Sequence, residues 1–193
     1  MGVIKKFKEN NCTIAIWDMQ ESVEELVLLS EKVDLSKVAT EKRKKELLAS
    51  RLLLNEIHPI QQITYNKYGA PEIKNGDHIS ISHSKNLVAI ASSKQKIGLD
   101  IEQISEKPLR LSSKFISKDA CNNLSQEKAT LIWCCKEALF KWHQKGNIDF
   151  KNDITLKPFI LEDEGKVTAI FKSKKYTLYY KKVDTHFLVY VCT

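Results

Sequence analysis

The chain has 193 residues, with 31 Lys and Arg against 24 Asp and Glu, so its formal net charge is +7 at pH 7. Hydrophobic residues make up 42% of the sequence and Gly and Pro are few, which excludes long disordered tracts and leaves enough chain for one ordinary domain or two small ones. The sequence has neither an apolar run long enough to span a membrane nor the apolar core of a signal peptide at its start. We therefore expect a cytoplasmic protein whose basic surface binds an anionic partner.

The five cysteines show no repeated spacing along the chain. Cys134 and Cys135 are adjacent, which suits neither a zinc knuckle nor an ordinary disulfide. We interpret the cysteines as reduced and mostly buried thiols, as in a cytoplasmic protein.

The first part of the chain predicts a strand followed by two helices. Residues 12–18 read as the strand, and a capping-box pattern opens a helix over 22–29. A second helix is predicted over about 40–57 and ends before Pro59. Its opening run of charged residues, 41–46, is interpreted as a solvated face, with phosphate binding by some of these residues as the alternative.

Three strands are predicted after the second helix. Residues 62–65 read as a strand and 66–71 as a loop, and then 78–82 and 87–92 alternate as a hairpin does. His83 is placed where the hairpin turns, a position at which a lone histidine is most often exposed and has no function.

The second part of the chain predicts a similar order of elements with one more strand. A strand over 97–102 precedes short helices over 109–116 and 117–120, and then a long helix over about 126–144 that ends at Gly146. Strands follow at 154–159, 167–171, 176–181 and 187–192, with a turn predicted at 163–165. The repeated order suggests two similar halves that join near 92–96.

Two carboxylates lie on one face of the strand predicted over 97–102. Asp100 and Glu102 are two residues apart, so both side chains project to the same side of that strand. Their mutual repulsion favours a cation between them, and ligands that are all oxygen favour Mg²⁺ or Mn²⁺ over zinc. The alternative is an exposed strand face with two solvated acids.

A third acidic residue lies in the long helix about 35 residues further on. Glu137 and Lys141 are four residues apart and share one helix face. One interpretation makes them a surface ion pair of small worth. The other makes Glu137 a further metal ligand or a base, with Lys141 beside it facing a phosphate group.

Four stretches in this order resemble the 4′-phosphopantetheinyl transferase superfamily. They are Gly69-Ala70-Pro71, Ser80-Ile81-Ser82-His83-Ser84, Ile97-Gly98-Leu99-Asp100 and Trp133-Cys134-Cys135-Lys136-Glu137-Ala138 with Lys141. The resemblance implies an α+β fold, with a pseudo-twofold arrangement of two similar halves. Each half would be a small, mostly antiparallel sheet packed on helices, with the active site in the cleft between the halves. On this basis residues 1–93 would contact coenzyme A, and 94–193 would carry the metal and catalytic motifs.

The resemblance also implies a reaction: transfer of the 4′-phosphopantetheine arm of coenzyme A to a serine hydroxyl of a carrier protein. Asp100, Glu102 and Glu137 match the family's ligands for Mg²⁺, and Mn²⁺ is a possible substitute. Glu137 also matches the proposed general base, and Lys141 matches a lysine that faces coenzyme A phosphate. Trp133 is expected in the core.

Residues for binding coenzyme A are implied in the first half. His83 matches a histidine that contacts a phosphate, and the 3′-phosphate is assigned to Arg43 or Arg51, with Lys37 and Lys42 as further candidates. The other expected contacts are Ser82, Lys67 and Gly69. Ala70 departs from the family's lysine at that position, which leaves one phosphate or adenine contact in doubt unless Lys67 replaces it.

The expected partners are coenzyme A and an acidic acyl or peptidyl carrier protein, with the chain acting as a monomer and with no membrane or nucleic acid. One alternative is a catalytically silent module of the same fold that binds coenzyme A or a carrier protein. Another is a basic nucleic-acid-binding domain that uses 42–45 and 172–175. No recognition motif with interleaved aromatic residues supports the latter.

Overall fold

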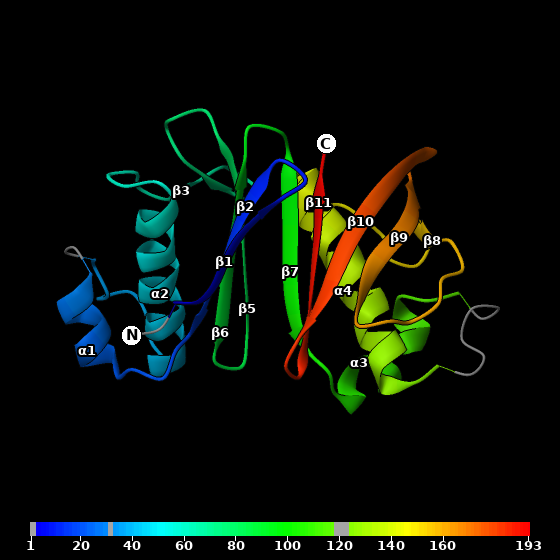
Figure 1. Cartoon of the computed structure of the whole chain (residues 1–193), viewed down its shortest axis with the longest axis horizontal. Coiled ribbons are helices and arrows are strands. Elements are labelled where there is room, and N and C mark those ends of the chain that lie inside the picture. The colour runs from blue at the N-terminus through cyan, green and yellow to red at the C-terminus, as the bar shows by residue number, and fades with distance from the viewer. Residues whose placement is uncertain (1–2, 31–32, 118–123) are drawn as a thin grey trace. The chain divides into compact units, whose positions relative to one another are not determined.

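The computed structural model describes residues 3–30, 33–117 and 124–193. Its contacts divide the chain into two compact units, Met1–Ile97 and Gly98–Thr193. Each unit has one sheet of antiparallel strand pairs and its own helices (Figure 1). The predicted α+β class, with a sheet and helices in each half, is confirmed.

The described residues of unit 1, the unit Met1–Ile97, form a sheet of strand order β1-β2-β6-β5-β4-β3 and two helices. The sequence predicted most of these elements, but it missed β1 and the short strand β4, and it made the strand at 62–65 too long. The bounds are β1 Val3–Glu9, β2 Cys12–Asp18, α1 Val23–Leu29, α2 Glu41–Ile57, β3 Thr64–Tyr65, β4 Pro71–Glu72, β5 His78–Ser84 and β6 Leu87–Ser93.

Both helices of unit 1 begin at the caps that the sequence indicates. The Ser22 side chain accepts a hydrogen bond from the backbone of Glu25, whose own side chain accepts one from the Ser22 backbone. Thr40 caps α2 by accepting from the backbone N–H of Arg43. These caps satisfy N–H groups that have no partner inside the helix, so both helices start where the chain predicts.

The core of unit 1 lies between α2 and the sheet. Leu48, Leu53 and Leu54 of α2 are fully or almost fully buried among apolar side chains of β2, β5 and β6. Because side chains alternate along a strand, Ile79 and Ile81 of β5 face this core and His83 lies on the same side. The hairpin turn follows Ser84, so the prediction that His83 lies in the turn is wrong.

Unit 2, the unit Gly98–Thr193, has a sheet of strand order β7-β11-β10-β9-β8 with α4 packed on it. The helix predicted from Ser117 falls mostly on 118–123, outside the described residues. The bounds are β7 Ile97–Gln103, α3 Glu106–Arg110, a 3₁₀ turn Ser112–Lys114, α4 Gln126–His143, β8 Ile154–Leu156, β9 Glu164–Phe171, β10 Lys174–Val183 and β11 His186–Cys192.

Two turns in unit 2 differ from the prediction. The helix α4 ends at His143, and the left-handed residue that caps it is Gln144 (φ 63°), two residues before Gly146. The predicted turn at 163–165 is wrong because Glu164 and Gly165 belong to β9. The turn between β9 and β10 is instead Lys172–Ser173, whose positive φ values suit a two-residue hairpin.

Three of the four described cysteines are buried and all four are free thiols. Burial raises the pKa of both Cys134 and Cys135, and the nearby negative charge of Asp100 raises them further. Both thiols therefore stay protonated and serve as core side chains. None of the helices that the structure describes is long and apolar enough to cross a membrane.

Candidate functional site

Gly98 allows strand β7 to lie directly against helix α4 in unit 2. A Cβ atom at this position would lie 2.1 Å from the carbonyl oxygen of Ala138 and 2.5 Å from the backbone nitrogen of Trp142. Only glycine fits such a close approach of two backbones. The strand therefore brings Asp100 close to the face of α4 that carries Glu137 and Lys141.

Asp100 and Lys141 form an ion pair across this contact. The Lys141 Nζ donates a hydrogen bond of 2.8 Å to Asp100 Oδ1, and Asp100 is 4% exposed. A buried carboxylate is stable as an ion only when it is paired. The predicted alternative, a strand face with two solvated acids, is therefore wrong for Asp100.

Glu137 lies in a negatively charged environment on α4. Burial raises the pKa of its carboxyl to about 7, repulsion from Asp100 and Glu102 adds to the rise, and Lys141 partly opposes it. Glu102 itself is half-buried at the end of β7. A carboxyl with a pKa near neutrality can accept a proton at physiological pH.

The three carboxylates have the chemistry of a site for a hard divalent cation. All their donors are oxygen, and added positive charge would relieve the repulsion that raises the pKa of Glu137. Within the described ranges, however, no group of three or more His, Cys, Asp or Glu side chains is arranged to hold a metal ion. Binding by all three would therefore need side-chain rearrangement around the Asp100–Lys141 pair.

Two other residues of the same motif have structural roles. Lys136 is 3% exposed, and its ammonium group donates to the carbonyl oxygens of Phe150 and Ile154. It thereby ties the loop after α4 to the helix. Trp133 packs in an aromatic cluster with Phe115 and Phe150, at ring-centroid distances of 5.1 and 5.5 Å.

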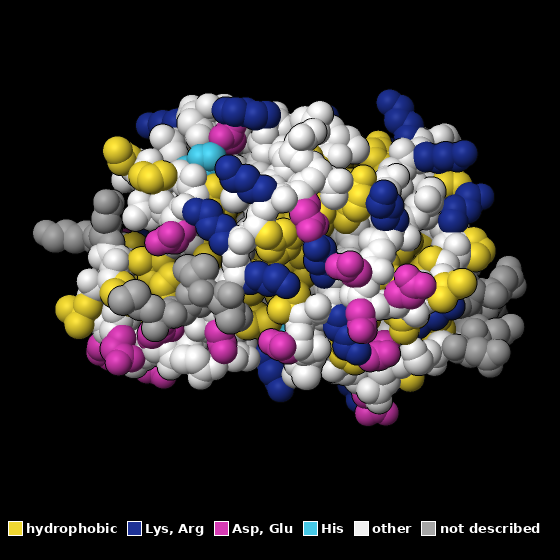
Figure 2. Space-filling model, in the orientation of Figure 1, with side chains coloured by type: hydrophobic (Ala, Val, Ile, Leu, Met, Phe, Trp, Pro, Cys, Tyr) yellow, Lys and Arg dark blue, Asp and Glu magenta, His cyan; other side chains and the backbone are white. Residues whose placement is uncertain are grey.

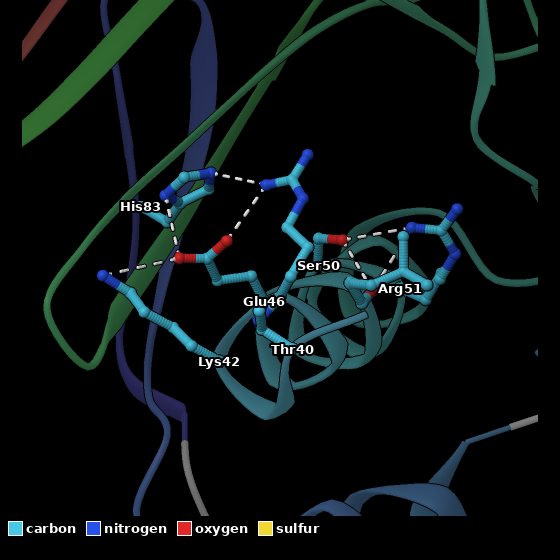
Figure 3. Close-up of polar contacts among 8 residues, drawn as sticks. Thr40, Lys42, Glu46, Ser50, Arg51 and His83 are labelled. Atoms are coloured by element: carbon cyan, nitrogen blue, oxygen red, sulfur yellow. Dashed lines mark hydrogen bonds and ion pairs between the residues drawn. The ribbon is translucent and has the colours of Figure 1, made fainter. Parts of the chain in front are cut away.

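A second group of charged residues lies in unit 1, around Glu46. This glutamate is 6% exposed, so the prediction that the whole run 41–46 is a solvated face is wrong. Its Oε1 lies 3.1 Å from His83 Nδ1 and 3.9 Å from Lys42 Nζ, and its Oε2 accepts from Arg43 Nη1 at 3.0 Å. Figure 3 shows the Glu46 carboxylate between His83 and Lys42.

Arg43 closes this cluster by a direct contact with the histidine. Its Nη1 lies 2.8 Å from His83 Nε2. The side chains of Arg43, Lys42 and His83 are 58%, 65% and 40% exposed. Their basic ends can therefore meet an anion from solvent, and the carboxylate that pairs with them lies beneath.

Arg51 does not join the cluster. It points away from His83 (Figure 3), and its Nη1 donates to Leu47 O at 3.2 Å and Ser50 Oγ at 3.3 Å. It lines a separate cavity of about 460 Å³ within unit 1, together with Leu29, Ser30, Val33, Asp34, Val38, Leu47, Leu52, Asn55, Ile60, Gln61, Gln62 and Ile63. The two arginines assigned to one phosphate thus lie at different places on α2.

The remaining predicted contacts for coenzyme A are spread over unit 1. Ser82 is buried and follows the alternation of β5 to the sheet face opposite His83. Lys67 is exposed and lies over the ring of Tyr68 at 5.0 Å. Gly69 has φ +80° in the turn after β3, which explains the need for glycine there without a ligand. Lys37 is exposed between α1 and α2.

Sequence reasoning missed Glu46, although a signal was present. Glu46 is spaced four, seven and eight residues from Ser50, Leu53 and Leu54, all of which are buried. That spacing puts it on the buried stripe of α2 despite its place in a charged run.

Comparison with known proteins agrees with the resemblance. Residues 96–192, just over half of the chain, match the 4′-phosphopantetheinyl transferase superfamily. The chain is also 28% identical over 140 residues to 4′-phosphopantetheinyl transferase gsp of Aneurinibacillus migulanus. That match covers 67% of this chain but only 57% of the relative. The chain belongs to the 4′-phosphopantetheinyl transferase superfamily.

Proposed function

We propose that the protein transfers the 4′-phosphopantetheine arm of coenzyme A to a serine hydroxyl of an apo carrier protein. Adenosine 3′,5′-bisphosphate is the second product. The observation that carries the proposal is the contact between β7 and α4, which brings Asp100 against Lys141 and near Glu137. A silent binding module would need no such group of charges at the family's motif.

In this proposal the residues of unit 2 act on the reacting groups. The serine oxygen bonds to the phosphorus that carries the pantetheine arm, while the bond from that phosphorus to the bridging oxygen breaks. Glu137 accepts the serine proton as the general base. Lys141 offers positive charge to the departing phosphate, and Asp100 holds the lysine in place.

Asp100, Glu102 and Glu137 are the proposed ligands for Mg²⁺, with Mn²⁺ as a substitute. A bound divalent cation would supply Lewis-acid polarisation of the pyrophosphate. Direct binding tests this assignment without activity: Mn²⁺ titrated into the protein and followed by electron paramagnetic resonance should bind to wild type and more weakly to Asp100→Asn. Equal affinities for the two proteins would contradict the ligand assignment.

Unit 1 is proposed to bind coenzyme A through its phosphate groups. His83 and Arg43, with Lys42, present basic groups from one cluster, so we propose Arg43 rather than Arg51 as the arginine that acts with His83. The residues Ser82, Lys67, Gly69 and Lys37 stay proposed contacts of coenzyme A.

The proposed protein partner is an acidic acyl or peptidyl carrier, and the proposed working form is a cytoplasmic monomer, since one chain carries both groups of candidate residues. The net charge of +7 favours association with an acidic protein. On the face shown in Figure 2, Lys and Arg side chains are scattered with Asp and Glu between them. The charge thus favours encounter broadly and does not by itself identify a docking patch.

Mass spectrometry of the carrier protein tests the reaction. An apo acyl carrier protein incubated with this protein, coenzyme A and Mg²⁺ should gain the mass of the phosphopantetheine arm, and a chelator should prevent the gain. A peptidyl carrier domain is tested in parallel, because the two carriers serve different pathways. Binding of coenzyme A without a mass gain on either carrier would contradict the proposed function and favour a silent binding module.

A further inference from the structure

Glu46 is the shared partner of the basic groups in unit 1. Its two carboxylate oxygens contact His83, Lys42 and Arg43, which come from α2 and from β5. We propose that Glu46 is a positioning residue: it holds the His83 ring and the Arg43 guanidinium in the arrangement that binds a phosphate group of coenzyme A. This inference rests on the proposed function and adds a residue to it.

The buried carboxylate of Glu46 and the basic side chains around it stabilise one another. A carboxylate that is 6% exposed is costly unless it is paired, and Glu46 is paired on both oxygens. Conversely, Lys42, Arg43 and His83 lie around one point and would repel one another when charged without the carboxylate. The negative charge of Glu46 therefore allows the basic groups to gather there before an anion is bound.

The contacts also determine which ring nitrogen of His83 carries the proton. Nδ1 faces Glu46 Oε1, which can only accept, so Nδ1 carries the hydrogen. Nε2 faces Arg43 Nη1, which can only donate, so Nε2 accepts. The ring is thus held at both nitrogens. A phosphate that takes the place of the Arg43–His83 contact would accept from Arg43, and from Nε2 once that atom has gained a proton from solvent.

Lys42 and Arg43 reach Glu46 because of their helix spacing. They are four and three residues before it, so the three side chains share a face of α2. Glu41 begins the same helix but is exposed. It therefore provides a matched control for removing one negative charge from α2.

The first experiment measures steady-state kinetics of Glu46→Gln, Glu46→Asp and Glu41→Gln with coenzyme A as the varied substrate. Glutamine keeps the shape but turns an amide N–H₂ group toward one of the basic partners. We expect Glu46→Gln to raise KM for coenzyme A by about tenfold, the effect of losing one charge-assisted hydrogen bond, with kcat within about twofold. Glu46→Asp, one methylene shorter, should lie between it and wild type, and Glu41→Gln should match wild type.

A double-mutant cycle tests whether Glu46 acts through its partners. On the background of His83→Ala, the change Glu46→Gln should raise KM by much less than it does in wild type, because the positioned ring is already absent. A purely structural role for Glu46 would give additive effects and would lower kcat and thermal stability together. Additive effects, or a Glu46→Gln variant that equals Glu41→Gln, would overturn the inference.

A spectroscopic measurement is independent of activity. The ¹⁵N chemical shifts of the imidazole should show wild-type His83 in the neutral form with the proton on Nδ1, and this signature should change in Glu46→Gln. A neutral form with the proton on Nε2 in wild type would overturn the inference even if Glu46→Gln fails to fold. If wild type neither binds coenzyme A nor modifies a carrier, the proposed function fails; if it does both and Glu46→Gln is unchanged, only this inference fails.

Discussion

At the scale of single residues, neighbours in one helical motif have different physical roles. Cys134, Cys135 and Lys136 are buried in unit 2, and Lys136 ties down a loop through two backbone carbonyls. Glu137 and Lys141 are half-buried on the face of α4 that meets Asp100. Successive side chains on a helix point about 100° apart, so neighbouring residues of the motif face different surroundings.

Glu137→Gln should raise the stability of the protein at pH 8 and abolish its transfer activity. The folded pKa of Glu137, about 7, is raised above the ordinary value of 4.5. The contribution of the Glu137 carboxyl to the free energy of unfolding is therefore fully present below pH 4.5, and it is lost as the pH rises through 7. In urea unfolding at pH 8 without metal, we expect the variant to be more stable than wild type, by on the order of 2 kcal/mol.

Under the proposed mechanism the same variant should lose transfer activity, because an amide can neither accept the serine proton nor provide a charged metal ligand. The stability difference between the two proteins should shrink at pH 4.5, where the wild-type carboxyl is protonated in the folded state and half protonated in the unfolded state. A variant that is inactive and also less stable at pH 8 would contradict the repulsion described for Glu137. Full activity would contradict its proposed role as the base.

At the scale of elements, the close crossing of β7 and α4 builds the candidate site of unit 2. The strand supplies Asp100 and the helix supplies Lys141, and Gly98 allows the two backbones to approach. Glycine at this position is thus required by packing, and its effect on function is indirect. The motif residues Gly98 and Asp100 belong together because one permits the contact that the other uses.

Gly98→Ala should disrupt this crossing. The added methyl group would overlap backbone atoms of Ala138 and Trp142, which cannot move as a flexible side chain can. We expect a loss of on the order of 3 kcal/mol or more in the free energy of unfolding, measured by denaturant titration.

Gly165→Ala in β9 is the control for this variant. Its Cβ atom would lie 3.1 Å from the hydroxyl oxygen of Tyr180, a side-chain atom that can shift. We expect a smaller loss of stability than for Gly98→Ala. Equal stabilities of the two variants would contradict the role assigned to the close crossing.

At the scale of the whole molecule, net charge affects the rate of encounter with the proposed carrier protein. A protein of charge +7 attracts an acidic carrier over a distance that salt shortens. Raising the ionic strength from about 0.05 to 0.5 M should lower kcat/KM for an acidic carrier by roughly tenfold, while kcat at saturating carrier changes little. A kcat/KM independent of salt would show that charge attraction does not assist encounter.

The local elements were largely predictable because their signals lie within a few residues. The capping box at Ser22 and the cap at Thr40 each determine where a helix begins, and the alternation of apolar and polar residues along β5 determines a strand. Strand β1 was missed, although Asn10 and Asn11, both with positive φ, are a recognisable hairpin turn before β2. The turn predicted at 163–165 is wrong because two acidic residues followed by glycine can also stand at the start of a strand, as they do at the start of β9.

The sequence by itself determined the family, the α+β class and the identity of Asp100, Glu137 and Lys141 as candidates, because these depend on residue types at set spacings. Only the tertiary structure decided that His83 and Arg43 contact Glu46 and each other, and that Arg51 lines a different cavity. It likewise decided that Ser82 and His83 lie on opposite sheet faces. The physical reason is that burial and partners are set by what packs against each helix or strand, and these contacts join residues far apart in the chain.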